Sequence, residues 1–376
     1  MRSILDEIVR LRKEAPYTFD RRNSNRYRLV VEEENGSKTA YCFSAPIYHH
    51  QTRRLLDLRF HQNADTWSAY GSTTEITAGE DFLLKNSSGF CRLSISGGIT
   101  VKTEGVVYCH TVEVYPTTNG LAIKAPVLVD ETHQMNLFSG LPFLNLRDND
   151  RCFSLMGDKF KPFVTVCAIG TLDQNGRVIA PCRIDYQKIN DQEYLLSLTH
   201  EAPEGTFILY EVNLYEPKLF QDTTVESKHP KVNNAYGSTA FLGQTAAYGE
   251  QWLYLRPDLS KFSDLLNKRI EKAVLHLPNI GGDVVELSAF RLAQRFCSFG
   301  SNWSNKISAT TPLSDAAVTD RYHSLDITEL ISDPYSQYIK PTEGLILKTK
   351  AKGSGFAAVA TSDSCYAPQI LEINFS

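Results

Sequence analysis

The chain opens with a short amphipathic pattern of helical period. Apolar residues recur at positions that one side of a helix would bring together, at Ile4, Leu5, Ile8, Val9 and Leu11. Asp6 and Arg10 fall on the opposite side, and Pro16 ends the pattern. We therefore predict an N-terminal helix within residues 1–15, which either docks on the body of the protein or mediates oligomerisation.

Beyond Pro16 the period changes to that of β-strands. Short runs of apolar and β-branched residues are separated by Gly, Pro, Asn and Asp, and Asn-Gly pairs at 35–36, 119–120 and 175–176 are typical of tight hairpins. No long helical pattern alternates with these runs, which argues against a parallel α/β sheet. The pattern predicts an all-β fold of two antiparallel β-sandwich, jelly-roll-like domains.

The alternating pattern is lost between residues 216 and 231. This stretch is polar and contains Pro217 and Pro230, so we predict a linker there. The expected organisation is then a β-rich domain over 16–215, the linker, and a second β-sandwich over 232–376.

Composition and charge narrow the classes of partner. Apolar residues make up 42% and charged residues 22% of the 376 residues, as in ordinary globular proteins. The net charge of −4 offers no general attraction for a phosphate backbone, so we expect no nucleic-acid partner. No apolar stretch approaches the roughly 20 residues of a membrane-spanning helix.

The cysteines and the N-terminus bear on the compartment. None of the eight cysteines forms a CxxC pair, so we interpret them as buried thiols rather than metal or redox motifs and leave their disulfide state open. No apolar run of signal-peptide length follows Met1. We expect a chain made in the cytoplasm without a signal peptide, its final location open, with a particle or cell surface as candidates.

Five segments of the C-terminal region resemble the DNRLRE domain, a bacterial β-sandwich module related in shape to carbohydrate-binding modules. They are Asn234–Gly243 (NAYGSTAFLG), Trp252–Ser260 (WLYLRPDLS), Ile270–Leu277 (IEKAVLHL), Tyr322–Leu330 (YHSLDITEL) and Phe356–Phe375. The resemblance spans about residues 232–376 and implies a binding or structural module. Residues 16–215 resemble no family that we can name.

The segment Phe296–Lys306 is the best candidate for a ligand-binding site. It interleaves three aromatic residues with Ser, Asn and Lys, as sugar-binding surfaces do. We name Trp303, Phe299, Asn302 and Asn305 as candidate ligand-binding residues. The alternative is that Trp303 closes one end of the sandwich core.

Metal and catalytic motifs are weak. Neighbours His49 and His50 point to opposite faces of a strand and do not converge with His61 on one ion without a bend. Residues 148–150 (Asp-Asn-Asp) resemble the start of a calcium loop but lack its glycine and closing glutamate. We expect no cofactor, leave a structural calcium ion open, and find no nucleophile elbow, phosphate loop or zinc-protease motif.

These observations favour a non-enzymatic structural or interaction protein that acts through a protein partner or self-assembly, as a displayed component of a phage-like or cell-envelope assembly. One alternative is a carbohydrate-binding protein that uses the Trp303 segment. A second alternative is a glycan-active enzyme with its site in residues 16–215, since a pair of catalytic carboxylates has no sequence signature.

Overall fold

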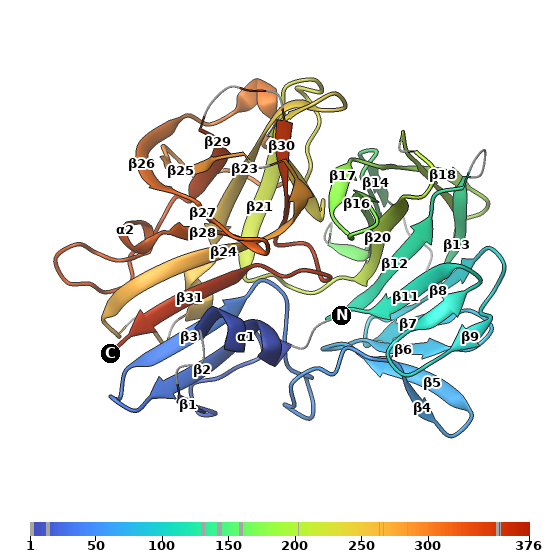
Figure 1. Cartoon of the computed structure of the whole chain (residues 1–376), viewed down its shortest axis with the longest axis horizontal. Helices are drawn as coiled ribbons and strands as arrows, with labels where there is room; N and C mark the ends of the chain where they lie inside the picture. The colour runs from blue at the N-terminus through green and yellow to red at the C-terminus, as the bar shows by residue number, and fades with distance from the viewer. Residues whose placement is uncertain are drawn as a thin grey trace. The chain divides into compact units, whose positions relative to one another are not determined.

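The computed structural model describes residues 4–12, 16–128, 132–140, 145–157, 161–201, 203–262, 264–265, 267–283, 285–350, 353 and 355–376. The protein is all-β, as predicted, and consists mainly of antiparallel strands with two short α-helices (Figure 1). It divides into two compact units. We call Ile47–Pro217 the inserted unit, and Leu5–Pro46 together with Lys218–Ser376 the host unit.

The inserted unit is a sandwich of two antiparallel sheets. One is an eight-stranded sheet in the order β18-β19-β13-β8-β7-β6-β5-β4. Its strands are β4 (His61–Asn63), β5 (Thr66–Tyr70), β6 (Glu75–Ala78), β7 (Phe82–Asn86), β8 (Gly89–Ile95), β13 (His133–Ser139), β18 (Arg183–Lys188) and β19 (Glu193–Thr199).

In the facing sheet of the inserted unit, each strand from β9 to β12 pairs with the next, and β20, β16, β15 and β14 continue the series. A short strand, β17, pairs with the end of β16. The strands are β9 (Val101–Lys102), β10 (Val107–Cys109), β11 (Val112–Pro116), β12 (Gly120–Pro126), β14 (Asn145–Asp148), β15 (Cys152–Met156), β16 (Pro162–Leu172), β17 (Val178–Ala180) and β20 (Phe207–Leu214).

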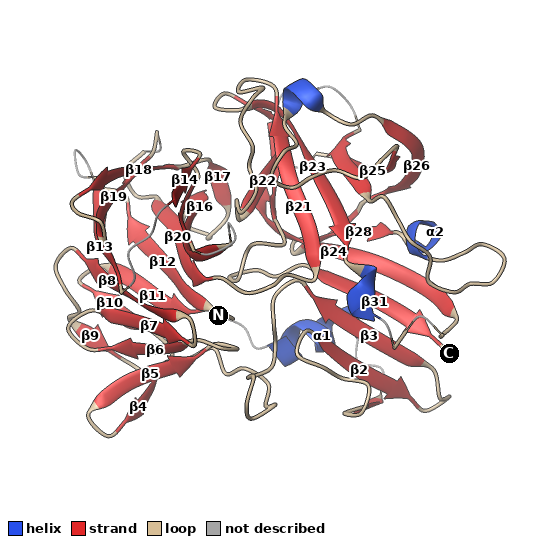
Figure 2. Ribbon diagram, turned by 180° about the vertical axis from the view of Figure 1, so that it is seen from behind, coloured by secondary structure: helices blue, strands red, loops and turns tan. Residues whose placement is uncertain are grey.

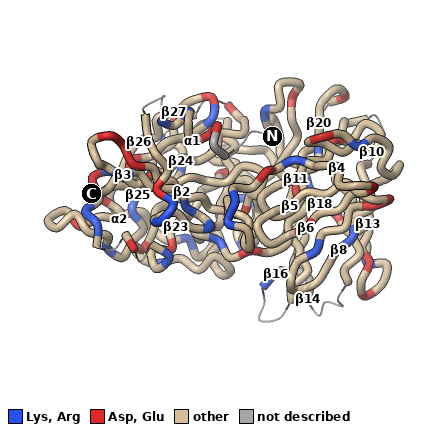
Figure 3. Tube along the Cα trace, turned by 90° about the horizontal axis from the view of Figure 1, so that it is seen from below, with Lys and Arg blue, Asp and Glu red and all other residues tan. Residues whose placement is uncertain are grey.

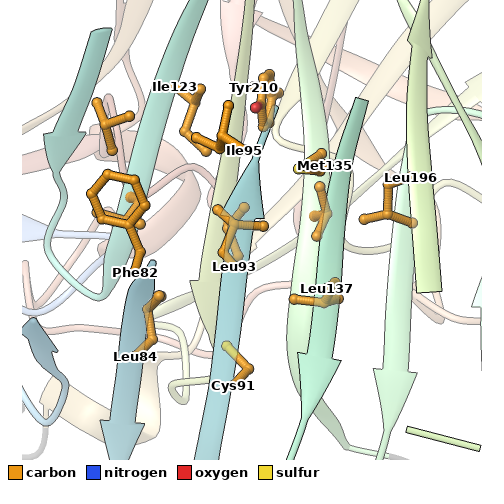
Figure 4. Close-up of a cluster of buried hydrophobic side chains, with 14 of the residues drawn as sticks. Phe82, Leu84, Cys91, Leu93, Ile95, Ile123, Met135, Leu137, Leu196 and Tyr210 are labelled. Atoms are coloured by element: carbon orange, nitrogen blue, oxygen red, sulfur yellow. The ribbon is translucent and has the colours of Figure 1, made fainter. Parts of the chain in front are cut away.

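Alternation along these strands builds one core between the two sheets. Leu93 on β8, Leu137 on β13 and Leu196 on β19 are buried on one side, and Ile123 and Tyr210 meet them from the facing sheet (Figure 4). Residues of period two on each strand thus share one apolar interior, and their neighbours face outwards.

The host unit contains a second sandwich, which begins with the N-terminal strands. One sheet runs β1-β2-β3-β31-β24-β28-β27, so that β3 pairs with the last strand of the chain. Its strands are β1 (Tyr17–Phe19), β2 (Arg28–Glu33), β3 (Lys38–Phe43), β24 (Ile270–Gly282), β27 (Ala317–Val318), β28 (Tyr322–Asp326) and β31 (Ile370–Phe375).

In the facing layer of the host unit, β21, β23, β29, β25 and β26 pair in that order. A hairpin strand, β22, joins β23 to β30, and β30 pairs with the bent end of β24. Figure 2 shows β21, β23 and β25 of this layer. The strands are β21 (Phe220–Glu226), β22 (Thr239–Thr245), β23 (Gly249–Pro257), β25 (Leu287–Leu292), β26 (Ala309–Asp315), β29 (Leu345–Thr349) and β30 (Gly355–Ala360).

The predicted N-terminal helix is α1 (Ile4–Arg12); residues 1–3 and 13–15 lie outside the described residues. It docks on the host unit, with Ile8 fully buried. Glu7 accepts a hydrogen bond from the Tyr322 hydroxyl at 2.7 Å and pairs with Arg321 at 3.0 Å. Of the two roles expected for this helix, the structure shows docking on the body of the protein. Among the described residues, the other helical segments are α2 (Thr328–Ile331) and the 3-10 turns η2 (Leu259–Phe262) and η3 (Trp303–Asn305).

The predicted domain boundaries differ from the structure in two places. The expected linker over 216–231 is wrong in its central part, because Phe220–Glu226 form β21 and pair along their whole length with β23. Residues 16–46 were assigned to the first domain, but they belong to the host unit because β3 pairs with β31.

The chain leaves and re-enters the host unit at neighbouring points. Ser44 follows β3 and its carbonyl accepts a hydrogen bond from the Leu219 N–H at 3.4 Å, just before β21. The backbone N–H of Ser44 also donates to the Gln369 carbonyl at 2.8 Å. Residues 47–217 are thus an insertion into the host sandwich, joined to it by two adjacent connections.

Candidate functional site

A face of the host unit carries a row of aromatic and lysine side chains. In β23, β29 and β25 the residues Leu253, Leu347 and Ala289 face the core, and alternation turns their neighbours to the other face. That outer face is partly covered by the segment 293–308. The Tyr254 hydroxyl donates to the Ile307 carbonyl at 3.2 Å and accepts from its N–H at 2.9 Å.

Five side chains, from the covering segment and from the strands beneath it, form what we call the aromatic–lysine platform. They are Trp252, Phe290, Trp303, Lys306 and Lys348. The indole rings of Trp252 and Trp303 lie with their centroids 4.7 Å apart and their planes tilted by 49°. Such offset, tilted pairs are the favourable arrangement for aromatic rings.

The two lysines lie against the faces of these rings. Lys306 Nζ is 4.1 Å from the ring centroid of Trp303, and Lys348 Nζ is 5.3 Å from that of Trp252 and 4.6 Å from that of Phe290. The two neighbouring indole rings thus each have an ammonium group close to a ring face. Each such contact is worth about 0.5–1 kcal/mol at an exposed site, so a ligand can redirect the ammonium groups at small cost.

Two ammonium groups and one carboxylate border the platform, since Trp252 Nε1 donates a hydrogen bond to Glu250 Oε1 at 2.9 Å. Within the described part of the chain, neither Lys306 nor Lys348 has a carboxylate within 4 Å. By contrast, Lys350 near the same strand pairs with Asp315 at 2.7 Å. Acidic and basic positions are otherwise interspersed along the host unit (Figure 3). Flat apolar ring surface beside two ammonium groups suits a ligand that combines an apolar face with a negative charge.

The residues predicted from the sequence take different roles. Trp303 belongs to the platform. Phe299 is 55% exposed, and its ring lies 5.3 Å from that of Tyr236, so it forms a separate aromatic contact.

Asn302 and Asn305 hold the turn that presents Trp303. The Asn302 side-chain oxygen accepts from the N–H groups of Ser304 and Asn305, and the Asn305 side-chain oxygen accepts from the Asn302 N–H at 2.8 Å. Asn305 Nδ2 also donates to the Gly300 carbonyl at 2.9 Å. This reciprocal capping box uses the side-chain oxygens of both residues within the chain.

Sequence analysis missed Trp252, Phe290 and Lys348. Alternation with Leu253 and Leu255 already placed Trp252 on the outer face of a strand. That signal did not say which strands lie beside it, and this pairing is what brings Lys348 and Phe290 to the same surface.

A second cluster in the host unit has the residue types of a hydrolase triad. His276 Nδ1 lies 2.8 Å from Ser324 Oγ, and His276 Nε2 lies 3.0 Å from Glu372 Oε2. The three residues lie on adjacent strands β24, β28 and β31, whose backbone N–H groups serve the ladder and are not presented as an oxyanion hole. Tyr322, bound to α1, packs its ring on His276 at 5.7 Å, so this network ties the sheet to the helix.

A carboxyl pair lies beside β21 in the same unit. Asp222 is buried, and its Oδ2 accepts a hydrogen bond from the Ser362 N–H at 2.5 Å. Burial, and then the neighbouring Asp363, raise the pKa of Asp222 well above its ordinary value; Lys218 opposes this shift. Burial also raises the pKa of Asp363. The pair retains a proton under conditions in which exposed aspartates have lost theirs.

The weak metal motifs are dispersed. His61 Nε2 contacts Asp57 at 3.1 Å, whereas His49 Nδ1 accepts from the Thr52 N–H at 3.2 Å. Asn149 Oδ1 accepts from the Cys152 N–H at 2.9 Å in a local turn, and the side chain of Asp148 lies outside the described part of the chain. Among the described residues, no three His, Cys, Asp or Glu side chains gather around a metal-sized site.

We compared the chain with protein families and with curated proteins. No family model matches the chain, and no curated protein matches it. The resemblance of 232–376 to the DNRLRE domain therefore stays a prediction. Within the described residues, no helix is long and apolar enough to cross a membrane.

Proposed function

We propose that this protein binds an acidic glycan on the aromatic–lysine platform of its host unit. The observation that carries the proposal is the contact between the indole rings of Trp303 and Trp252, with the Lys348 ammonium group beside Trp252. Sugar rings stack on indole faces, and a lysine ammonium attracts a carboxylate or phosphate on the sugar. The proposal thus takes up one of the alternatives drawn from the sequence, that of a carbohydrate-binding protein.

The two indole planes are inclined by 49°, and Lys306 Nζ lies 4.1 Å from the centroid of Trp303 and 5.6 Å from that of Trp252. A sugar ring that stacks on these indoles therefore displaces the Lys306 ammonium group. Segment 293–308 buries Phe296 and Ile307 beneath the platform and so fixes the position of Trp303. A rigid aromatic surface loses little entropy when a ligand binds.

The test is titration calorimetry of the full chain with oligogalacturonate, and with a neutral glucan of the same length as the matched ligand. We expect binding of the acidic oligomer that weakens as salt concentration rises, because salt screens the attraction between the ammonium groups and the carboxylates of the oligomer. Equal binding of the neutral glucan, or no binding of either oligomer, would contradict the proposal.

Two pairs of variants locate the site. Trp303→Ala removes one aromatic ring of the platform and should weaken binding by about 30-fold, which corresponds to about 2 kcal/mol. Its control is Tyr335→Ala, because Tyr335 is an aromatic residue of the same unit that is 96% exposed. Lys348→Ala should weaken binding roughly 5-fold, whereas Lys350→Ala, which removes an ion-paired lysine beside the same strand, should leave it unchanged.

A further inference from the structure

Two cysteines of the inserted unit face each other across neighbouring strands. Cys152 on β15 is the direct partner of Cys167 on β16, and their Sγ atoms are 3.0 Å apart. Both side chains are buried, and both are thiols. All eight cysteines lie in described parts of the chain, and the structure shows a sulfur–sulfur contact for this pair.

The strand register favours a covalent bond between them. The Ala168 N–H donates to the Arg151 carbonyl at 2.8 Å, so residues 151 and 168 are a hydrogen-bonded pair. The next pair along an antiparallel ladder is then a non-hydrogen-bonded one, in which Cα atoms are about 4.5 Å apart and side chains are closest. That separation lies at the short end of the range that disulfides span, about 4.4–6.8 Å.

We propose that Cys152 and Cys167 are a redox-sensitive pair that closes to a cross-strand disulfide by exchange with a small-molecule disulfide such as oxidised glutathione. One cysteine thiolate attacks the small disulfide, which forms a mixed disulfide and releases one small thiol. The second cysteine then attacks the mixed disulfide and releases the other. One S–S bond breaks, one forms, and both cysteine protons end on the two released thiols.

Four other buried cysteines have few thiolates at neutral pH. Burial raises the pKa of Cys42, Cys91 and Cys182 to about 12 and that of Cys109 to about 11. The proposed pair becomes accessible when the edge of this sheet opens, because β15 pairs with β14 on its outer side and with β16 on its inner side. Opening of the two outer strands costs less than unfolding of the whole unit.

The experiment uses the full chain with Cys297→Ser, which removes the exposed thiol and leaves the seven other cysteines of the eight in place. Samples are equilibrated over a series of oxidised-to-reduced glutathione ratios, quenched in acid, alkylated in denaturant and mapped by mass spectrometry. We expect one linked peptide pair containing Cys152 and Cys167, lost again on addition of dithiothreitol, and a thermal midpoint raised by several degrees in the oxidised form.

Matched variants separate this pair from general oxidation. Cys167→Ser should abolish the linked peptides, whereas Cys91→Ser, which changes another buried cysteine of the same unit, should retain them. Full alkylation of Cys152 and Cys167 at every ratio, or linkage of either to a different cysteine, would overturn the proposal. Since linkage is read in the unsubstituted pair, the result does not depend on Cys167→Ser folding.

Discussion

The buried carboxyl of Asp222 makes the stability of the host unit depend on pH in an unusual direction. Asp222 is 5% exposed, and burial and Asp363 together raise its pKa above the ordinary value of 3.8. Above that pH an unfolded chain releases the proton that the folded unit keeps. The folded state then binds more protons, so its stability at this site falls as pH rises until the folded pKa is passed.

The size of the effect follows from linkage. One proton held by the folded state alone lowers the free energy of unfolding by about 1.4 kcal/mol for each pH unit. Asp222→Asn removes this titration and keeps an oxygen that can accept from the Ser362 N–H. We expect the variant to match the wild type near pH 4, and its advantage in stability to grow by about 1.4 kcal/mol per pH unit until the folded state releases the proton.

Urea unfolding of the full chain between pH 4 and 8 provides the assay. A Trp67→Phe background leaves Trp252 and Trp303 as the fluorescent reporters, and both belong to the host unit. The quantity compared is the difference between variant and background at each pH, which cancels other titrating groups. Asp320→Asn, an exposed aspartate of the same unit, is the control and should give a difference near zero throughout.

A difference that does not grow with pH would refute the reasoning, because it would mean that Asp222 ionises equally in the folded and unfolded states. Destabilisation by Asp222→Asn at every pH would refute it too, since it would show that the ionised carboxylate is the form that the fold requires.

Three further predictions concern the inserted unit and the domain boundary. Gly120→Ala should cost about 1–3 kcal/mol in urea unfolding, because a Cβ there would lie 2.0 Å from a backbone carbonyl oxygen of β20, whereas Gly79→Ala has its nearest neighbour at 3.9 Å and should be neutral. Burial lowers the pKa of His133 to about 4, so the inserted unit should lose roughly 3 kcal/mol as pH falls from 7 to 4, and an NMR titration that places His133 near 6.5 would contradict this. Replacement of 47–217 by a short Gly-Ser linker should leave a host unit that unfolds cooperatively. A fragment 232–376 should not fold, because it lacks β1–β3 and β21. Cooperative unfolding of that fragment would show that these strands are dispensable.

Local features of the fold were readable from the sequence. The Asn-Gly pair at 35–36 lies in the hairpin between β2 and β3, with Gly36 at φ +82°, and the pair at 175–176 connects β16 to β17, with Gly176 at φ +77°. These positions need a left-handed backbone, which glycine adopts without penalty. The N-terminal helix was equally local, because its apolar side follows from spacing alone.

The candidate site was only partly predictable. Trp303 stood out as an aromatic residue in a polar connection, and that signal needed no partner. The polar residues beside it were assigned to a ligand, but Asn302 and Asn305 direct their oxygens into the turn. Capping by asparagine and ligand binding by asparagine have the same sequence pattern, so only the hydrogen bonds distinguish them.

What the sequence by itself determined is the strand content, the tight turns, the terminal helix and the all-β class. The tertiary structure alone decided that β3 pairs with β31, that 47–217 is an insertion, and that Cys152 meets Cys167. The reason is physical: side-chain alternation is a property of neighbouring residues, whereas strand pairing is a long-range choice. Each doubling of the loop length adds only about 0.6 kcal/mol, so sequence distance restricts only weakly which strands meet.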